Sequence, residues 1–222
     1  MPIGERDVVR AAYAWNLAVE VARTGATAAL IAPAESGSAL LWPDPGTGPV
    51  GCEMILTGAT GLADLNRVAL DVAVARAADA SDGGIVLVRV PPEWLADASD
   101  ARGLLRWILL FGTTEHSDQL EAYRLTQQLL EAHPDAKIGI TIHGATRVAE
   151  ARHAFHRIAD LAARRLHHVL LSYGLLVDDL HVYRAIVARR PIGLEHPQSR
   201  AALALHDVAR LLLEDARKIA LA

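Results

Sequence analysis

The sequence predicts an α/β protein with a doubly wound, mostly parallel sheet and helices on both of its faces. Two observations lead to this expectation. Segments whose apolar residues recur at helical spacing alternate with short, uniformly apolar segments, which are typical of strands buried on both faces. The alternation continues through the chain without an obvious boundary, so we expect a single domain over residues 1–222.

The first elements follow from local pattern and turn residues. Residues 7–23 predict a helix, which ends at Thr24-Gly25 because glycine readily takes the left-handed conformation beyond a helix C-terminus. The apolar segment at residues 27–32 predicts a buried strand. A Gly/Pro-rich loop is expected over residues 36–51.

The remaining elements repeat the alternation. Strands are expected at residues 52–56, 84–90, 106–112, 137–143 and 167–174. Helices are expected at residues 61–80, 117–132, 146–165, 178–189 and 199–219. The last helix has an apolar stripe beside acidic and basic residues, so we expect it to dock on the core rather than on a lipid surface.

Composition and charge exclude several classes of protein. The chain is 52% hydrophobic with a net charge of −4, which is typical of a globular domain. A nucleic-acid-binding domain would be far more basic, so we expect no nucleic-acid partner. A single cysteine, Cys52, forms no internal disulfide and no C-x-x-C site, so a cytoplasmic location is expected. No apolar run reaches the ~18 residues of a membrane span, and we expect no membrane association.

Basic and histidine-rich residues gather in the predicted helix at 146–165 and just after it. We interpret the five arginines as a solvated helix face, because Glu150 and Asp160 interrupt them: Arg147, Arg152, Arg157, Arg164 and Arg165. His153 and His156 stand three positions apart, which metal sites permit, but no carboxylate or cysteine completes a ligand set at a recognised spacing. We therefore expect surface histidines and no metal site.

A glycine-rich turn follows the predicted strand at 52–56. Its sequence, ILTGATG at residues 55–61, resembles the TGATG turn of extended short-chain dehydrogenases. Asp64 stands where the third glycine of a dinucleotide-binding fingerprint belongs, and its charge would obstruct a pyrophosphate. A Rossmann-like NAD(P)-dependent oxidoreductase that uses the turn at residues 58–61 stays open as an alternative.

Two groups of segments carry a resemblance that covers most of the chain. The first group is Asn16-Leu17-Ala18-Val19, Ala22-Arg23-Thr24-Gly25-Ala26 and Leu30-Ile31-Ala32. The second is Tyr173-Gly174-Leu175-Leu176-Val177-Asp178-Asp179, Val182, Ala185 and Arg189-Arg190-Pro191-Ile192. In this order they resemble the MinD/ParA-type deviant P-loop ATPases, among them the flagellar-number regulators FlhG/FleN.

The resemblance implies a phosphate-binding loop whose chemistry has been lost. Alignment on Asn16 places the family's deviant Walker loop on residues 4–12, where Gly4 remains but Glu5 replaces the signature lysine. Arg10 stands at the second lysine, and Ala11 replaces the hydroxyl that holds Mg²⁺. Other family positions also lose their chemistry: the water-orienting acid falls on Ala32 or Pro33, the metal-linked aspartate near Arg89 and the adenine-contacting asparagine on His143.

These losses predict a protein that neither binds nor hydrolyses ATP. We expect a MinD/ParA-type pseudo-ATPase without a cofactor, a scaffold or regulator of positioning or assembly that binds partner proteins through residues 178–189 and 36–51. Any homodimer should be independent of nucleotide. The alternative is a nucleotide-binding protein of this type, in which Gly4, Arg6 and Arg10 hold the phosphates of ATP or ADP at the start of the first helix.

The resemblance also implies a strand that the sequence lacks. Family members have a central strand before the phosphate loop, whereas only six residues, short and polar, precede Asp7. Three arrangements would account for this: a rearranged sheet, a strand at residues 52–56 in the vacant position, or an edge supplied by another chain.

Overall fold

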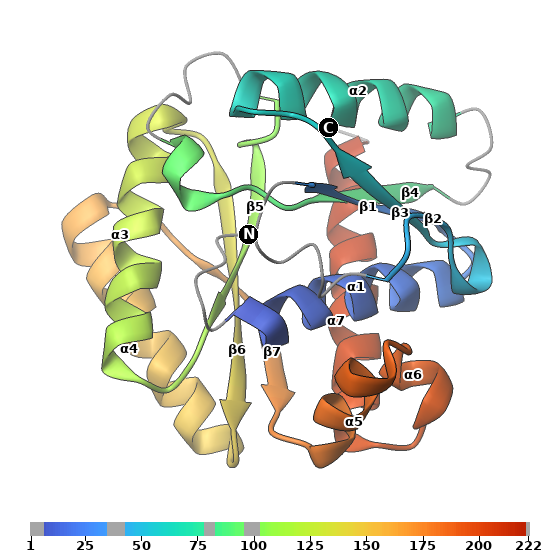
Figure 1. Ribbon diagram of the computed structural model, residues 1–222. Coiled ribbons are helices and arrows are strands. Elements are labelled where there is room, and N and C mark those ends of the chain that lie inside the picture. The colour runs from blue at the N-terminus through green and yellow to red at the C-terminus, as the bar shows by residue number, and fades with distance from the viewer. Residues whose placement is uncertain (1–6, 35–42, 78–82, 96–102, 221–222) are drawn as a thin grey trace.

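The computed structural model describes residues 7–34, 43–77, 83–95 and 103–220 (Figure 1). The strands of this part of the chain form two hydrogen-bonded sheets. The first has the order β2 (Gly46–Thr47), β3 (Glu53–Thr57), β1 (Thr27–Pro33) and β4 (Gly84–Val88). The second has the order β5 (Trp107–Gly112), β6 (Lys137–Ala145) and β7 (Leu171–Val177).

Neighbouring strands pair in parallel except at one edge, where the short β2 pairs antiparallel with β3. The prediction of a mostly parallel arrangement is therefore confirmed. Within the described residues, β4 and β5 each end a sheet and do not pair with each other.

Helices cover both faces, as expected for a doubly wound fold (Figure 1). One face carries α1 (Asp7–Arg23), α5 (Leu180–Ala188), α6 (Ile192–Glu195) and α7 (Arg200–Ala220). The other carries α2 (Leu62–Ala77), α3 (His116–Ala132) and α4 (Val148–Leu166). A short 3₁₀ helix, Pro49–Gly51, precedes β3.

Helix α1 lies at the centre of the main core cluster. Its residues Ala14, Leu17, Ala18 and Val21 are buried in this cluster, and the helix contacts α7 and β1. This cluster includes Ile85 of β4 and Tyr173 of β7, so it joins the two sheets from one side. The expectation of a single domain stays a prediction.

The last helix docks on the core as predicted. Leu205, Val208 and Leu212 of α7 are buried, whereas Asp207 and Arg210 face solvent. The apolar stripe read from the sequence is thus the stripe that packs against α1, β7 and β4.

Some element boundaries differ from the sequence-based expectations, and one short helix was not expected. Strand β7 begins at Leu171 rather than at residue 167, because His167 takes a left-handed conformation (φ 53°) as the C-cap of α4. The chain then needs His168 to Leu170 to reach the register in which Leu171 pairs with Gly139. The single turn of α6 was not expected, since Pro191 and Gly193 interrupt the pattern there.

The structure also bears on the vacant strand position. Strand β3 pairs with β1 on the side away from β4, with Ala29 opposite Glu53. The segment at residues 52–56 therefore does not fill a position between the two sheets, and this one of the three arrangements is wrong.

Candidate functional site

A group of charged and aromatic side chains lies at the carboxyl ends of β5 and β6. In open α/β sheets this is the edge at which ligands bind. Arg10 comes from α1, Asp118 and Glu121 come from the start of α3, and His143 comes from β6. The residues form a connected set, which we call the Arg10 cluster.

Arg10 is the cation of the cluster, and it is engaged by carboxylates. Its Nη2 donates to Asp118 Oδ2 at 3.2 Å and its Nη1 to Glu121 Oε2 at 3.4 Å. The side chains of Arg10 and Asp118 are only 4% and 5% exposed, while that of Glu121 is partly open to solvent. Thr113 Oγ1 donates a further hydrogen bond to Asp118 Oδ2 at 2.8 Å.

The charge balance of the cluster is unfavourable for an anion. Two carboxylates face one guanidinium, so the group carries more negative than positive charge. A buried ion pair is retained because separation would leave an uncompensated charge in a medium of low polarity. Arg10 is therefore committed to its carboxylate partners.

His143 lies between aromatic rings beside this ion pair. Its ring centroid is 5.5 Å from that of Tyr13 and 6.4 Å from that of Phe111. The pKa of His143 is lowered to about 4, chiefly by burial and in addition by the charge of Arg10, while Asp118 opposes both effects. The imidazole is thus neutral at pH 7, and its Nε2 has no hydrogen-bond partner among the described residues.

Two tyrosines lie between the Arg10 cluster and the end of β7. Burial raises the pKa of the Tyr13 phenol, and the nearby Tyr183 and Asp178 raise it further. Tyr183 in turn donates to Asp178 Oδ1 at 3.4 Å. These groups hold neutral phenols at pH 7 and supply neither a nucleophile nor a cation.

The structure describes only part of the residues that the sequence suggested for a phosphate site. Gly4 and Arg6 lie outside the described residues, whereas Arg10 belongs to the cluster and Ala11 is fully buried beside it. His143, which the sequence resemblance aligned with an adenine-contacting asparagine, lies in the same cluster. The structure thus brings Arg10 and His143 together.

The other aligned positions lie at strand ends of the first sheet. Ala32 and Pro33 are buried at the end of β1. Arg89 directly follows β4, is buried, and donates its backbone N–H to the carbonyl of Ile31 at 2.8 Å. No carboxylate stands at either position to hold a metal or orient water.

Sequence analysis missed the acidic half of the cluster. Asp118 and Glu121 lie 108 and 111 positions from Arg10. An acid in the first turn of a helix is ordinary, because it interacts favourably with the helix dipole. The sequence holds no local signal that Asp118 would be buried against α1.

The alternative candidate sites are surface features. The Gly58–Gly61 turn does connect β3 to α2, but Asp64 stands in the first turn of α2 and forms an exposed pair with Arg67 at 3.2 Å. His153 and His156 are exposed on α4, as expected. No group of three metal-ligating side chains occurs within the residues that the structure describes.

The five arginines from the predicted basic helix are also exposed, Arg147 as the residue before α4 and the other four on it. This agrees with the interpretation of a solvated face. In the described ranges, no helix combines the length and the apolar character needed to cross a membrane.

Helix α5 presents apolar side chains to solvent. Leu180 and Tyr183 are exposed, and Val187 is 86% exposed. Asp179 anchors the helix: its Oδ1 accepts from the N–H of His181 at 2.9 Å and its Oδ2 from that of Ala201 at 3.3 Å. Burial works to raise the pKa of Asp179, but these backbone N–H groups prevail and lower it.

Comparison with solved structures shows which known fold the chain resembles. No protein-family model and no curated protein matches the sequence. The chain is similar to MinD in the MinC:MinD cell division complex of Aquifex aeolicus, at 16% identity and a TM-score of 0.69 over 96% of this chain and 93% of that one. It is similar to the cell division ATPase MinD of Pyrococcus furiosus at 15% identity and a TM-score of 0.65, with 96% of each chain covered.

A third similar structure is a ParA family ATPase from Chlorobium tepidum, at 12% identity and a TM-score of 0.52 over 94% of this chain and 93% of that one. Identities this low establish shared architecture only. The expected relationship is thereby confirmed at the level of the fold, and the chain has the MinD/ParA type of α/β fold.

Proposed function

We propose that this protein is a MinD/ParA-like domain that has lost ATP binding and hydrolysis and acts as a protein-interaction scaffold or regulator of cellular positioning or assembly. The observation that carries the proposal is the engagement of Arg10 by Asp118 and Glu121. Arg10 aligns with the lysine of the family's phosphate loop, and here that cation is neutralised within the protein.

The residues around Arg10 do not fit a nucleotide with Mg²⁺. A phosphate loop needs converging backbone N–H groups, a free cation and a hydroxyl for the metal. Ala11 has no hydroxyl, and the two carboxylates beside Arg10 would repel a phosphate. Each lost charge-assisted contact costs about 1.5–3 kcal/mol, so the joint loss removes useful affinity.

The fold itself accommodates nucleotide in other proteins. A septum site-determining MinD from Pyrococcus horikoshii is described in complex with Mg-ADP, and this chain covers 93% of it with a TM-score of 0.63. The difference that we propose therefore resides in side chains rather than in topology.

The proposed partner-facing surface includes α5. Exposed apolar residues at Leu180, Tyr183 and Val187 are poorly suited to water and well suited to a protein contact. The MinD chain from Aquifex aeolicus occurs in a complex with MinC, so this architecture is compatible with protein complexes. We further propose that any homodimer forms without nucleotide and that the protein acts in the cytoplasm.

Titration calorimetry with ATP and Mg²⁺, and with ADP, tests the loss of nucleotide binding. We expect no heat of binding and no thermal stabilisation at millimolar nucleotide. Micromolar affinity would contradict the proposal, and its loss in the Arg10→Met variant would favour the nucleotide-binding alternative.

Proximity labelling in the native cell tests the scaffold role. We expect Val187→Asp to remove a reproducible set of labelled proteins, because a charge on the apolar surface of α5 disfavours docking. Arg184→Asp, an exposed change on the same helix, is the matched control. Identical labelling by wild type and Val187→Asp would contradict a role for α5.

A further inference from the structure

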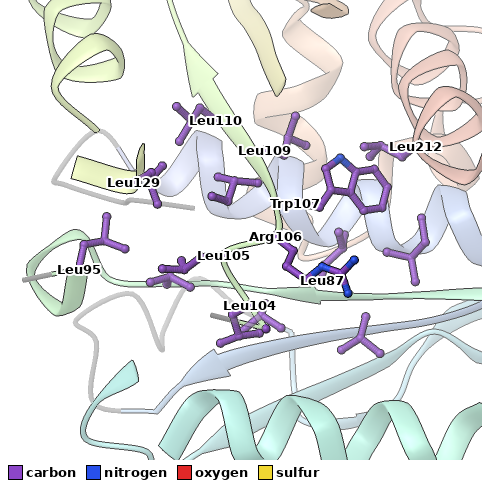
Figure 2. Close-up of a pocket in the computed structure, with 16 residues that line it drawn as sticks. Leu87, Leu95, Leu104, Leu105, Arg106, Trp107, Leu109, Leu110, Leu129 and Leu212 are labelled. Carbon is purple, nitrogen blue, oxygen red and sulfur yellow. The ribbon is translucent and has the colours of Figure 1, made fainter. Parts of the chain in front are cut away.

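Helix α2 has apolar residues on two opposite sides, and the core of the protein accounts for one of them. On the inner side, Leu65 is fully buried in a cluster that includes Val88 of β4 and Leu104. Leu104 also lines an apolar cavity of about 350 Å³ between β4 and β5 (Figure 2). The inner side of α2 is therefore anchored on the interior of the protein.

The outer side of α2 also carries large apolar side chains. Leu70 is 54% exposed and Val74 is 74% exposed, and neither belongs to a core cluster of the described residues. Residues four positions apart lie on the same side of a helix, so these two side chains are neighbours. Small residues, which allow a second helix to approach closely, occupy most of the other exposed positions: Ala63, Ala73, Ala75 and Ala77.

Helix α4, in the same helical layer, has a different outer side. Its buried positions are apolar, whereas its exposed positions hold mainly charged residues and histidines, among them Arg152, His153, Arg157 and Arg164. This is the usual distribution for a helix that faces water. Helix α2 lies at the outside of the first sheet (Figure 1) and departs from this distribution, which is typical of a contact surface.

Charged residues flank Leu70 on the outer side of α2. Arg67 lies one turn before Leu70, and its Nη2 pairs with Asp64 Oδ1 at 3.2 Å. A guanidinium has five N–H donors, so Arg67 can donate to a second carboxylate as well. Asp71 directly follows Leu70 and forms no ion pair with a described residue. The surface thus offers both a cation with spare donors and an acid that lacks a cation.

These charges suit a second copy of α2 in one orientation. In a parallel pair of α2 helices, Arg67 would lie beside Arg67 of the other copy, and Asp71 beside Asp71. In an antiparallel pair about a two-fold axis at Leu70, Arg67 of each copy lies within about one helical turn of Asp71 of the other. The antiparallel order also opposes the two helix dipoles favourably.

From this surface we infer that α2 is a self-association site, at which two copies of the protein pair through antiparallel α2 helices about a two-fold axis near Leu70. A two-fold contact requires a surface that is complementary to itself. The outer side of α2 meets this requirement, because apolar residues lie at the axis and opposite charges lie before and after it. The inference deepens the proposed nucleotide-independent homodimer and rests on that part of the proposed function.

The expected association is weak. A contact made by one helix alone is smaller than the roughly 800 Å² per partner that standard interfaces bury. We therefore expect a dissociation constant on the order of tens of micromolar.

Sedimentation velocity of the full chain over a range of protein concentrations, with and without ATP and Mg²⁺, measures the association. We expect a reversible monomer–dimer equilibrium that nucleotide leaves unchanged. Leu70→Asp should raise the dissociation constant at least about tenfold, because it places two like charges at the axis. Val148→Asp, which changes an exposed valine at the start of α4, is the matched control and should leave the equilibrium unchanged. Circular dichroism checks that both variants are folded.

A charge exchange tests the antiparallel order. Arg67→Asp and Asp71→Arg should each weaken self-association about threefold or more, because each places like charges opposite one another. An equimolar mixture of the two variants should form heterodimers about as readily as the wild type forms homodimers, since one chain then offers acids and the other offers bases. Native mass spectrometry distinguishes these species, because the two variants differ in mass.

Three results would overturn the inference and leave the rest of the proposed function standing. They are a protein that stays monomeric up to about 1 mM, a dimer that Leu70→Asp leaves intact, and a mixture of the charge variants that forms no heterodimer. Association that occurs only with ATP and Mg²⁺ would overturn both the inference and the proposed loss of nucleotide binding.

Discussion

Two arginine–aspartate ion pairs have the same nitrogen–oxygen distance, and each lies near the carboxyl ends of strands in a different sheet. Arg10 and Asp118 are 3.2 Å apart with side chains 4% and 5% exposed. Arg67 and Asp64 are also 3.2 Å apart, with side chains 69% and 50% exposed. The geometry is the same, and burial differs.

The difference in burial determines how much each pair contributes to stability and whether its arginine is free to bind a ligand. A buried pair is strongly coupled to folding, because loss of one partner leaves a charge without solvent or counterion. An exposed pair is screened by water and salt and contributes about 0–1 kcal/mol. The cation that the phosphate-loop alignment selects, Arg10, is thus the one that is held by the protein interior.

The largest effect is expected on removal of Asp118. Asp118→Ala should lower the free energy of unfolding by about 3–5 kcal/mol, because Arg10 would stay buried beside the partly exposed Glu121 alone. Urea denaturation followed by circular dichroism measures the change. A variant with both Arg10→Met and Asp118→Leu removes the pair together, and it should recover most of the loss. A single-variant loss below about 1 kcal/mol would show that the pair behaves like a surface pair.

The second-largest effect is the pH dependence of stability that arises from His143, which lies beside the buried ion pair. The pKa of His143 is lowered from 6.5 to about 4, so the unfolded chain takes up a proton before the folded protein does. The stabilising contribution is present above pH 6.5 and is lost as the pH falls toward 4, by about 3 kcal/mol in total. Urea unfolding at a series of pH values measures this slope.

His143→Phe should flatten that part of the pH profile, because phenylalanine takes up no proton and suits the aromatic contacts with Tyr13 and Phe111. His153→Phe, an exposed change on α4, is the control and should leave the slope as in the wild type. An unchanged slope in His143→Phe would show that another group controls acid stability.

An intermediate effect is expected where α2 meets β3. Arg76 and Glu53 form a half-buried pair there, so it lies between the two extremes of the comparison. Glu53→Gln should lower the free energy of unfolding by about 1 kcal/mol. The loss is moderate because Arg76 stays partly hydrated and can still donate a hydrogen bond to the glutamine. Thermal unfolding at low and high salt provides the measurement, and a loss as large as that of Asp118→Ala would break the proposed order.

The smallest effect belongs to the exposed pair. Asp64→Ala should change the free energy of unfolding by no more than about 0.5 kcal/mol, and the change should vanish in high salt because the charges are screened. The salt dependence of urea unfolding checks this. A salt-independent loss above about 1 kcal/mol would mean that Asp64 has a structural role in the turn after β3.

Much of the fold could be read from pattern. The helix at residues 7–23 and the strand from residue 27 were predicted at their observed positions, because their apolar spacing and the turn at Thr24-Gly25 are local signals. The start of β7 was misplaced by four residues, since register against β6 determines it. Likewise, Asp118 carries no mark of burial in the sequence.

The sequence by itself determined the alternation of helices and strands and the apolar face of α7, because each depends on residue type and short-range spacing. The tertiary structure decided which charges meet. Arg10 and Asp118 become neighbours across 108 positions only when helices α1 and α3 pack together with the sheets. Burial and hydrogen-bond partnership are properties of that packing, and no local pattern encodes them.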